Sequence, residues 1–180
     1  MNKIVAIIGE PCTGKSTLVK AFMKQVIDFI PMVPAPLLPS YYSPMHNLYV
    51  FGVYDENETF GGTDRFSMSC QPRAEEFVKT ADANILFEGD RLCNQSFLEL
   101  ICDLPNTETK IILLHANPET LKARHVFRND TQSKQFQTSR DTKISRLAAN
   151  FELRPFIEEV MNSNEDQQKL ILNLLKKELL

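Results

Sequence analysis

The chain lacks the features of a secreted, membrane-spanning or repetitive protein. Its four cysteines, Cys12, Cys70, Cys93 and Cys102, show neither a C-x-x-C motif nor the spacing of a metal site, which indicates the reduced thiols of a cytoplasmic protein. No apolar run approaches the roughly 20 residues that span a bilayer, so we expect no membrane association. The apolar start of the chain is interrupted too early for a signal peptide. There is no internal repeat, and 180 residues are expected to form one domain, residues 1–180.

One short glycine-containing stretch carries the strongest functional signal. Residues 9–17 match the pattern G-x-x-x-x-G-K-S/T of a phosphate-binding P-loop. An apolar run suited to a buried strand precedes the stretch, and apolar residues at helical spacing follow it from Ser16 to about Phe29. We therefore expect ATP and Mg²⁺ to bind here, with the hydroxyl of Ser16 on the metal. The predicted nucleotide-binding residues of the loop are Gly9, Pro11, Cys12, Thr13, Gly14, Lys15, Ser16 and Thr17.

The pattern of apolar segments predicts the fold. Five strands are expected near residues 3–8, 48–54, 84–87, 110–115 and 157–161, with helices between them. The last helix should begin after Asn164, with Leu170, Ile171, Leu174 and Leu175 facing the core. This alternation predicts an α/β fold, a three-layer, doubly wound parallel sheet of about five strands.

Charged residues follow the second and third predicted strands. In open α/β sheets ligands bind at the carboxyl ends of strands, so these residues are candidates for the acceptor and metal sites. Glu88 is the first choice for orienting Mg²⁺ and Asp90 the second, as in a Walker-B pattern. Either Asp64 or Asp55 could position or deprotonate the acceptor hydroxyl. The candidates that bind substrate here are Asp55, Asp64, Arg65, Asp90 and Arg91.

A proline-rich segment, residues 30–44, separates the first helix from the second strand. Its five prolines exclude a helix or a central strand, so an extended segment is expected. It is either a surface connector or one wall of the acceptor site. In the second case Tyr41 or Tyr42 could stack on an acceptor ring.

Positive charge is concentrated late in the chain. Residues 122–154 hold eight Lys and Arg against three acids, so this stretch carries +5 and the rest of the chain, with −3 overall, carries −8. A helix, a polar loop and a helix that starts near Thr142 would form a lid over about residues 124–146. Its cations would neutralise the transferred phosphoryl group. They are Arg124, Arg128, Arg140 and Lys143.

Together the P-loop, the Asp-Arg pair after the third strand and the Arg-rich lid resemble the nucleoside and nucleotide kinases among P-loop proteins. The resemblance implies phosphate binding by Gly9–Thr17, a site role for Arg91, and lid roles for Arg124 and Arg128. The chain departs from two branches of this group, because Leu92 replaces the Tyr or His of thymidylate kinases and the Glu-Arg-Ser of deoxynucleoside kinases is absent.

A narrower resemblance involves residues 62–68, residues 88–92 and the segment from Arg128 to Ile144. These look like small phage kinases that phosphorylate the hydroxymethyl group of 5-hydroxymethyluracil in DNA during thymidine hypermodification. The resemblance implies DNA as the partner, the host cytoplasm as the location, and site roles for Asp64, Arg91, Arg128 and Lys143. The predicted catalytic residues are Lys15, Asp64, Glu88 and Arg128, and the predicted metal ligands are Ser16 and Glu88.

Two alternatives remain open at this stage. The same lid would serve a kinase of free nucleosides or nucleoside monophosphates, and the acidic remainder of the chain favours a small substrate. A regulatory module that binds nucleotide without phosphoryl transfer is the second alternative. A GTPase is excluded because no Asp is followed three residues later by Gly, and the Ser-Gly-Gly signature of ABC proteins is absent.

Overall fold

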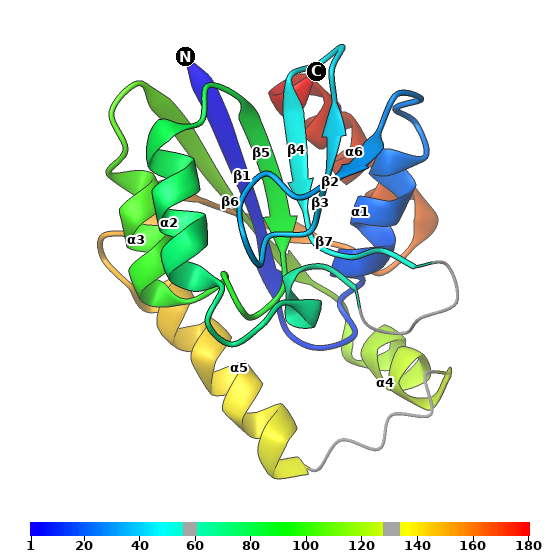
Figure 1. Cartoon of the computed structure of the whole chain (residues 1–180). Helices are drawn as coiled ribbons and strands as arrows, with labels where there is room; N and C mark the ends of the chain where they lie inside the picture. Colours follow the sequence, from blue (N-terminus) through cyan, green and yellow to red (C-terminus); the bar gives the residue numbers. More distant parts are fainter. Residues whose placement is uncertain (56–60, 128–133) are drawn as a thin grey trace.

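The computed structural model describes residues 1–55, 61–127 and 134–180. Its centre is a seven-stranded sheet in the order β2-β3-β4-β5-β1-β6-β7, drawn between two sets of helices in Figure 1. The strands are β1 (Asn2–Gly9), β2 (Ile30–Met32), β3 (Ser40–Ser43), β4 (Leu48–Phe51), β5 (Asn84–Glu88), β6 (Thr107–His115) and β7 (Ile157–Met161). Five neighbouring strands of the sheet, β4, β5, β1, β6 and β7, pair in parallel. At the edge next to β4, β3 pairs antiparallel with β4, and β2 pairs antiparallel with β3.

Helices cover both faces of this sheet (Figure 1). Those of the described part are α1 (Lys15–Met23), α2 (Gln71–Thr80), α3 (Gln95–Cys102), α4 (Pro118–Phe127), α5 (Lys134–Ala149) and α6 (Glu165–Leu179). Short 3₁₀ turns lie at η1 (Thr63–Arg65) and η2 (Arg154–Phe156). None of the described helices is long and apolar enough to span a membrane.

Alternating side chains of the strands fill two cores. Ile4, Ala6 and Ile8 of β1 face the core that contains residues of α2, α3 and α5. Val5 and Ile7 face the opposite core, which contains residues of α1 and α6. Successive side chains of a strand point to opposite faces, so a strand covered on both faces reads as one continuous apolar run.

The predicted α/β fold with its doubly wound parallel sheet is confirmed, and the five expected strands are its five parallel ones. The estimate of about five strands missed β2 and β3, two short strands of the proline-rich segment. Pro31 lies in β2 at the outer edge of the sheet, the place where a strand tolerates proline.

Two helix boundaries differ from the expectation. The first helix ends at Met23, and Ile27, whose spacing had extended the helical pattern, is 94% exposed. The helix expected from Thr142 begins at Lys134. Among the side chains of this helix whose burial is described, the buried apolar ones are Ile144 and Leu147 in its second half, the part that the apolar pattern marked.

Candidate active site

The P-loop joins the end of β1 to the start of α1. Gly14, directly before α1, has the left-handed backbone angles φ 93° and ψ 20°, which glycine adopts without the strain of a side chain. The Nζ atom of Lys15 donates hydrogen bonds to the carbonyl oxygens of Gly9 and Glu10, both at 2.8 Å. The loop thus holds the ammonium group of Lys15 at the N-terminus of a helix, where backbone N–H groups bind phosphate. Pro11 lies in the turn of the loop, and Ser16 and Thr17 lie in the first turn of α1.

Two side chains from other elements hold the P-loop in place. Arg124 of α4 donates from Nη1 to the carbonyl oxygen of Cys12 at 3.2 Å and from Nη2 to that of Asn162 at 2.9 Å. Asn162, directly after β7, is 1% exposed and donates from Nδ2 to the carbonyl oxygen of Thr13 at 2.8 Å. A Cβ on Gly14 would lie 2.7 Å from the same Nδ2, so this packing also requires glycine at position 14.

β5 ends in a buried carboxylate. Glu88 is 1% exposed and lies in register with Ile7 of β1, two residues before the P-loop begins. Gly62 lies against it, because a Cβ at position 62 would overlap the Glu88 carboxylate. Gly62 is fixed by two backbone hydrogen bonds with Val53, at 3.0 and 3.2 Å.

Gly61, directly before Gly62, borders the start of α1. A Cβ on Gly61 would lie 3.4 Å from the Cβ of Ser16, whereas Gly62 contacts the Glu88 carboxylate. Ser16 and Glu88, the two predicted metal ligands, therefore lie on either side of one short segment that only small residues could form.

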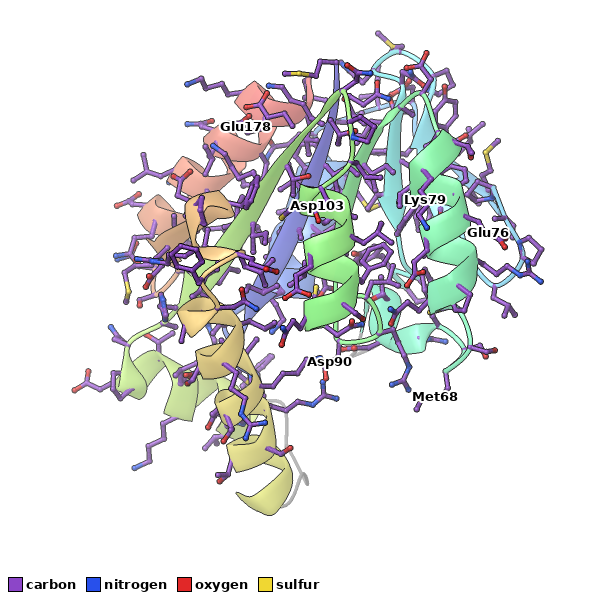
Figure 2. The ribbon with its side chains drawn as sticks, turned by 90° about the vertical axis from the view of Figure 1, so that its left-hand side faces the viewer. Met68, Glu76, Lys79, Asp90, Asp103 and Glu178 are labelled. Atoms are coloured by element: carbon purple, nitrogen blue, oxygen red, sulfur yellow. The ribbon has the colours of Figure 1, made fainter. Side chains whose placement is uncertain are left out.

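Two aspartates meet at the carboxyl end of β5. Oδ1 of Asp64 accepts a hydrogen bond from the backbone N–H of Asp90 at 2.6 Å. The carboxylate of Asp90 pairs with Arg140 and, at 3.2 Å, with Nζ of Lys143. Lys143 also donates to the Asp90 carbonyl oxygen at 3.3 Å. These contacts connect α5 to the carboxyl end of β5, and Figure 2 shows Asp90 at the lower edge of the sheet, close to α5.

Asp64 lies among cations. Although the residue is at the surface, partial dehydration by the surrounding protein raises its pKa above the ordinary value for aspartate. Arg140, Lys15, Arg91 and Lys143 are close enough to act in the opposite direction. Dehydration also lowers the pKa of Lys143 and that of Arg140. A carboxylate of raised pKa beside the P-loop lysine is suited to accept a proton.

A family model described as P-loop Nucleotide Kinase3 matches residues 1–177. The chain belongs to this P-loop nucleotide kinase family. Among solved structures, shikimate kinase from Bacteroides thetaiotaomicron is similar, with a TM-score of 0.45 and 13% identity over 98% of this chain and 96% of that one. No curated protein matches the chain. The kinase-like character and the P-loop predicted from the sequence are thereby confirmed at the level of the family.

Within residues 1–55, 61–127 and 134–180, no group of three or more His, Cys, Asp or Glu side chains could hold a metal ion. Mg²⁺ in nucleotide sites is usually held by one or two side chains together with the phosphates. The buried carboxylate of Glu88 and the hydroxyl of Ser16 on α1 fit such a site, and the P-loop fits the phosphates of ATP.

Other predicted residues lie around this centre. Arg91 donates from Nε to the carbonyl oxygen of Phe66 at 3.3 Å and acts electrostatically on Asp64. Asp55 pairs with Arg65 at 3.2 Å, and its carbonyl oxygen accepts a hydrogen bond from Lys20. Of the two carboxylates considered as the base, Asp64 is the one for which an electrostatic interaction with Lys15 is found. The predicted Arg128 lies outside the described residues.

The stacking role of Tyr41 or Tyr42 remains a prediction, and the two rings lie in different surroundings. Tyr42 lies 4.5 Å from Tyr49, ring centre to ring centre, and its hydroxyl donates to Oδ1 of Asn47 at 3.0 Å. Asn47 precedes β4, so this contact lies at the end of the sheet opposite the P-loop. Tyr41 lies 6.3 Å from Tyr54 and packs against the core of α1 and α6.

Two residues that shape the site are not among the predicted site residues. Asn162 follows the last strand, and its place at a strand end is a signal that could have identified it. Gly62 stands in the segment already singled out, but its role depends on the approach of Glu88, 26 residues later in the sequence. No local pattern reports such an approach.

Proposed function

We propose that this P-loop nucleotide kinase transfers the γ-phosphoryl group of ATP, in the presence of Mg²⁺, to an acceptor hydroxyl held beside Asp64. The observation that carries the proposal is the set of contacts that joins the Asp64 carboxylate through Asp90 to Arg140 and Lys143, with Lys15 and Arg91 close enough to act on Asp64 electrostatically. Phosphoryl transfer needs positioned cations and a group that accepts the hydroxyl proton. Asp64 is the carboxylate that meets both requirements.

The residues divide into donor and acceptor roles. The P-loop backbone and Lys15 hold the phosphates of ATP, whereas Ser16 and Glu88 hold Mg²⁺, which offsets the negative charge of the phosphates when bound. Arg124 fixes the loop through its contact with Cys12.

The reaction itself takes place beside Asp64. Its carboxylate accepts the proton of the acceptor hydroxyl, while the acceptor oxygen bonds to the γ-phosphorus. The bond from that phosphorus to the bridging oxygen breaks, and ADP leaves. Arg91, Arg140 and Lys143 stabilise the negative charge that develops on the transferred group.

The acceptor that we propose is the hydroxymethyl group of 5-hydroxymethyluracil in DNA. Support comes from the resemblance of residues 62–68 and 88–92 to phage DNA kinases and from the basic stretch of residues 122–154. A base in duplex DNA would have to leave the stack to reach Asp64. A kinase of free nucleosides or nucleotides is the second candidate, favoured by the description of the matching family and by the acidic remainder of the chain.

One radiolabel experiment separates these candidates. The protein is incubated with Mg²⁺ and γ-radiolabelled ATP, together with duplex DNA that contains 5-hydroxymethyluracil, unmodified DNA, or a mixture of free nucleosides and nucleotides. Label in the modified DNA alone supports the proposed acceptor, and label in the free pool alone supports the second candidate. If no acceptor is labelled and none stimulates ADP release, the chain is a nucleotide-binding module instead. The Lys15→Ala variant is the control for contaminating kinases.

A further inference from the structure

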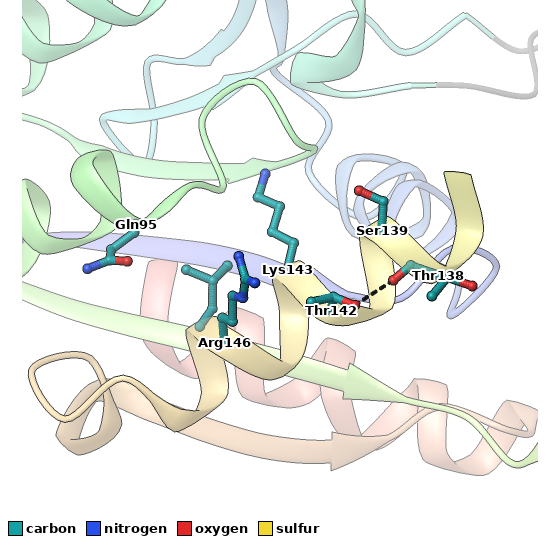
Figure 3. A pocket seen from close by; sticks show the side chains of 7 residues that line it. Gln95, Thr138, Ser139, Thr142, Lys143 and Arg146 are labelled. Carbon is teal, nitrogen blue, oxygen red and sulfur yellow. Dashed lines mark hydrogen bonds between the residues drawn. The ribbon is translucent and has the colours of Figure 1, made fainter. Parts of the chain in front are cut away.

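A groove lies between α3 and α5, next to the site but outside its predicted residues apart from Lys143. Its volume is about 640 Å³. Gln95 lines it from α3, and Thr138, Ser139, Thr142, Lys143 and Arg146 line it from α5. Figure 3 shows Gln95 and the α5 side chains on facing walls of this groove.

Two cations line the groove, and one of them, Lys143, is paired with the Asp90 carboxylate. Of the described side chains that line it, none is acidic and two, Lys143 and Arg146, are cationic. Arg146 is exposed and forms no ion pair with any described residue. Glu99, one turn after Gln95 on α3, accepts hydrogen bonds from the amides of Gln95 at 2.7 Å and Asn150 at 2.9 Å. Both of these hydrogen-bond donors to the Glu99 carboxylate are neutral side-chain amides.

Lys143 connects the groove to the reaction centre. Its side chain lines the groove, whereas its Nζ atom reaches Asp90, whose N–H donates to Asp64. The path from Asp64 to the groove therefore runs past Asp90 and along the side chain of Lys143, so an acceptor whose hydroxyl lies at Asp64 would follow this path to enter the groove. Ser139 and Arg146 would then offer it hydroxyl and guanidinium donors, the groups that bind phosphate oxygens, whereas the hydroxyl of Thr142 already donates to the Thr138 carbonyl oxygen at 2.8 Å.

We infer that the groove between α3 and α5 binds a phosphate group of the acceptor, separate from the one that is transferred. This inference rests on the proposed function, because it assumes an acceptor hydroxyl at Asp64. Two sources have the same chemistry, a phosphodiester of DNA beside the target nucleotide and the monophosphate of a free nucleotide. In either case the acceptor class is phosphate-bearing, and a bare nucleoside leaves the groove empty.

The test compares three acceptors with one reactive group. They are 5-hydroxymethyl-2′-deoxyuridine, its 5′-monophosphate, and a short single-stranded oligonucleotide that contains it. Each is assayed with the wild-type protein and with Arg146→Ala, Arg146→Lys and Lys177→Ala. Lys177 is an exposed cation of α6, on the opposite face of the sheet, so its variant has the same loss of charge without a change in the groove.

Arg146→Ala is expected to lower kcat/KM about tenfold for a phosphate-bearing acceptor, the size of one lost charge-assisted hydrogen bond. Activity on the nucleoside should stay unchanged, Arg146→Lys should recover part of the loss, and Lys177→Ala should resemble the wild type. A loss confined to the oligonucleotide identifies a phosphodiester, and a loss that includes the monophosphate identifies a free nucleotide. An equal loss on all three acceptors, or no loss on any, would overturn the inference.

A binding measurement keeps this test separate from the proposed function. The affinity of the fluorescein-labelled oligonucleotide is measured by anisotropy at several salt concentrations, with a non-hydrolysable ATP analogue and Mg²⁺ present. If the groove binds a phosphodiester, Arg146→Ala weakens binding and reduces the slope of log affinity against log salt by about 0.7, the value for one phosphate contact of a single strand. If it binds a mononucleotide, the monophosphate displaces the oligonucleotide from the wild type and not from Arg146→Ala. Failure of transfer together with either result would refute the proposed function and leave the groove as a phosphate site.

Discussion

The side-chain amide of Asn162 donates a hydrogen bond to the carbonyl oxygen of Thr13 at 2.8 Å, across a separation of 149 residues. The backbone carbonyl oxygen of Asn162 accepts a hydrogen bond from the guanidinium of Arg124. The backbone N–H of Asn162 donates to the carbonyl oxygen of His115 at the end of β6. The ends of β6 and β7, the helix α4 and the P-loop therefore meet at one buried residue. The shape of the phosphate-binding loop depends on the far end of the chain.

We expect Asn162→Ala to loosen the P-loop. Without the amide, the Thr13 carbonyl oxygen loses its partner, and an unsatisfied buried group costs about 1–3 kcal/mol. The KM for ATP should rise about tenfold, as for the loss of about 1.4 kcal/mol of binding free energy, with a smaller change in kcat. Urea unfolding and ATP titration of the initial rate measure the two effects. Asn173→Ala, at an exposed position of α6, is the control, and an unchanged KM for ATP in Asn162→Ala would rule out the positioning role.

Lys15→Ala should abolish transfer while leaving the fold intact. Lys15 contacts two carbonyl oxygens of its own loop, which water can satisfy in its absence, whereas no other side chain of the loop carries a positive charge. Loss of one electrostatic stabiliser of a transition state costs about 10²–10³ in kcat. Acceptor-stimulated ADP release measures the loss, and Lys24→Ala, just after α1, is the matched control. Turnover at the wild-type rate by Lys15→Ala would contradict the assignment of the P-loop.

The sequence predicted what local chemistry determines. β1, β5 and β6 each contain an apolar run, and Asn117 and Asn164 cap α4 and α6 by accepting the N–H of Thr120 and Gln167. The prediction of which residues of α6 face the core was wrong in part, since Leu170 is 69% exposed and Leu172 is buried. In a run of apolar residues the spacing alone leaves the rotation of the helix open.

In the candidate site, too, the sequence predicted the features that depend on neighbouring residues and not those that depend on distant ones. The P-loop could be found because its glycines and lysine are neighbours in the sequence. The contacts of Asp90 with Lys143 and of Asn162 with Thr13 join residues 53 and 149 positions apart, so no short pattern contains them. Tyr42 was one of two tyrosines considered for the acceptor site, and its pairing with Tyr49 and its hydrogen bond to Asn47 place it near the start of β4, away from the P-loop.

Glu178 should stabilise the fold in a pH-dependent way. The Glu178 carboxylate accepts hydrogen bonds from Nζ of Lys110 at 2.7 Å and from Nζ of Lys3 at 3.3 Å. These contacts connect α6 to β6 and β1 at the end of the sheet away from Asp90 (Figure 2). The hydrogen bond from Lys110 is the main cause that lowers the pKa of Glu178. A lowered carboxyl pKa contributes stability at neutral pH, and this contribution is lost as the pH falls through the lowered value.

Glu178→Gln is therefore expected to reduce the free energy of unfolding by about 1 kcal/mol at neutral pH. The difference from the wild type should shrink as the solution is acidified. Glu108→Gln provides the control, because Glu108 lies 4.0 Å from Lys3 and its side chain is 49% exposed, so its effect should be smaller. A difference that stays constant down to acidic pH would mean that packing, not charge, is responsible.

Asp64→Asn should separate activity from stability. Partial dehydration raises the pKa of Asp64, so the folded state binds its proton more tightly than the unfolded state does. The group contributes stability below the pKa of the unfolded state, and this contribution is lost as the pH rises through the raised folded value. At neutral pH the charged carboxylate thus opposes folding, and asparagine, which can still accept the N–H of Asp90, removes that cost.

The expected outcome is an equal or higher melting temperature at neutral pH together with a fall in kcat of about 10²–10⁴, the usual contribution of a general base. Any gain in stability over the wild type should disappear at acidic pH, where Asp64 itself is protonated. Asp55→Asn, which alters the exposed pair with Arg65, is the matched control and should retain most of the activity. If Asp55→Asn is the inactive variant and Asp64→Asn is not, the acceptor hydroxyl lies at Asp55, and the cations around Asp64 serve the fold instead of the reaction.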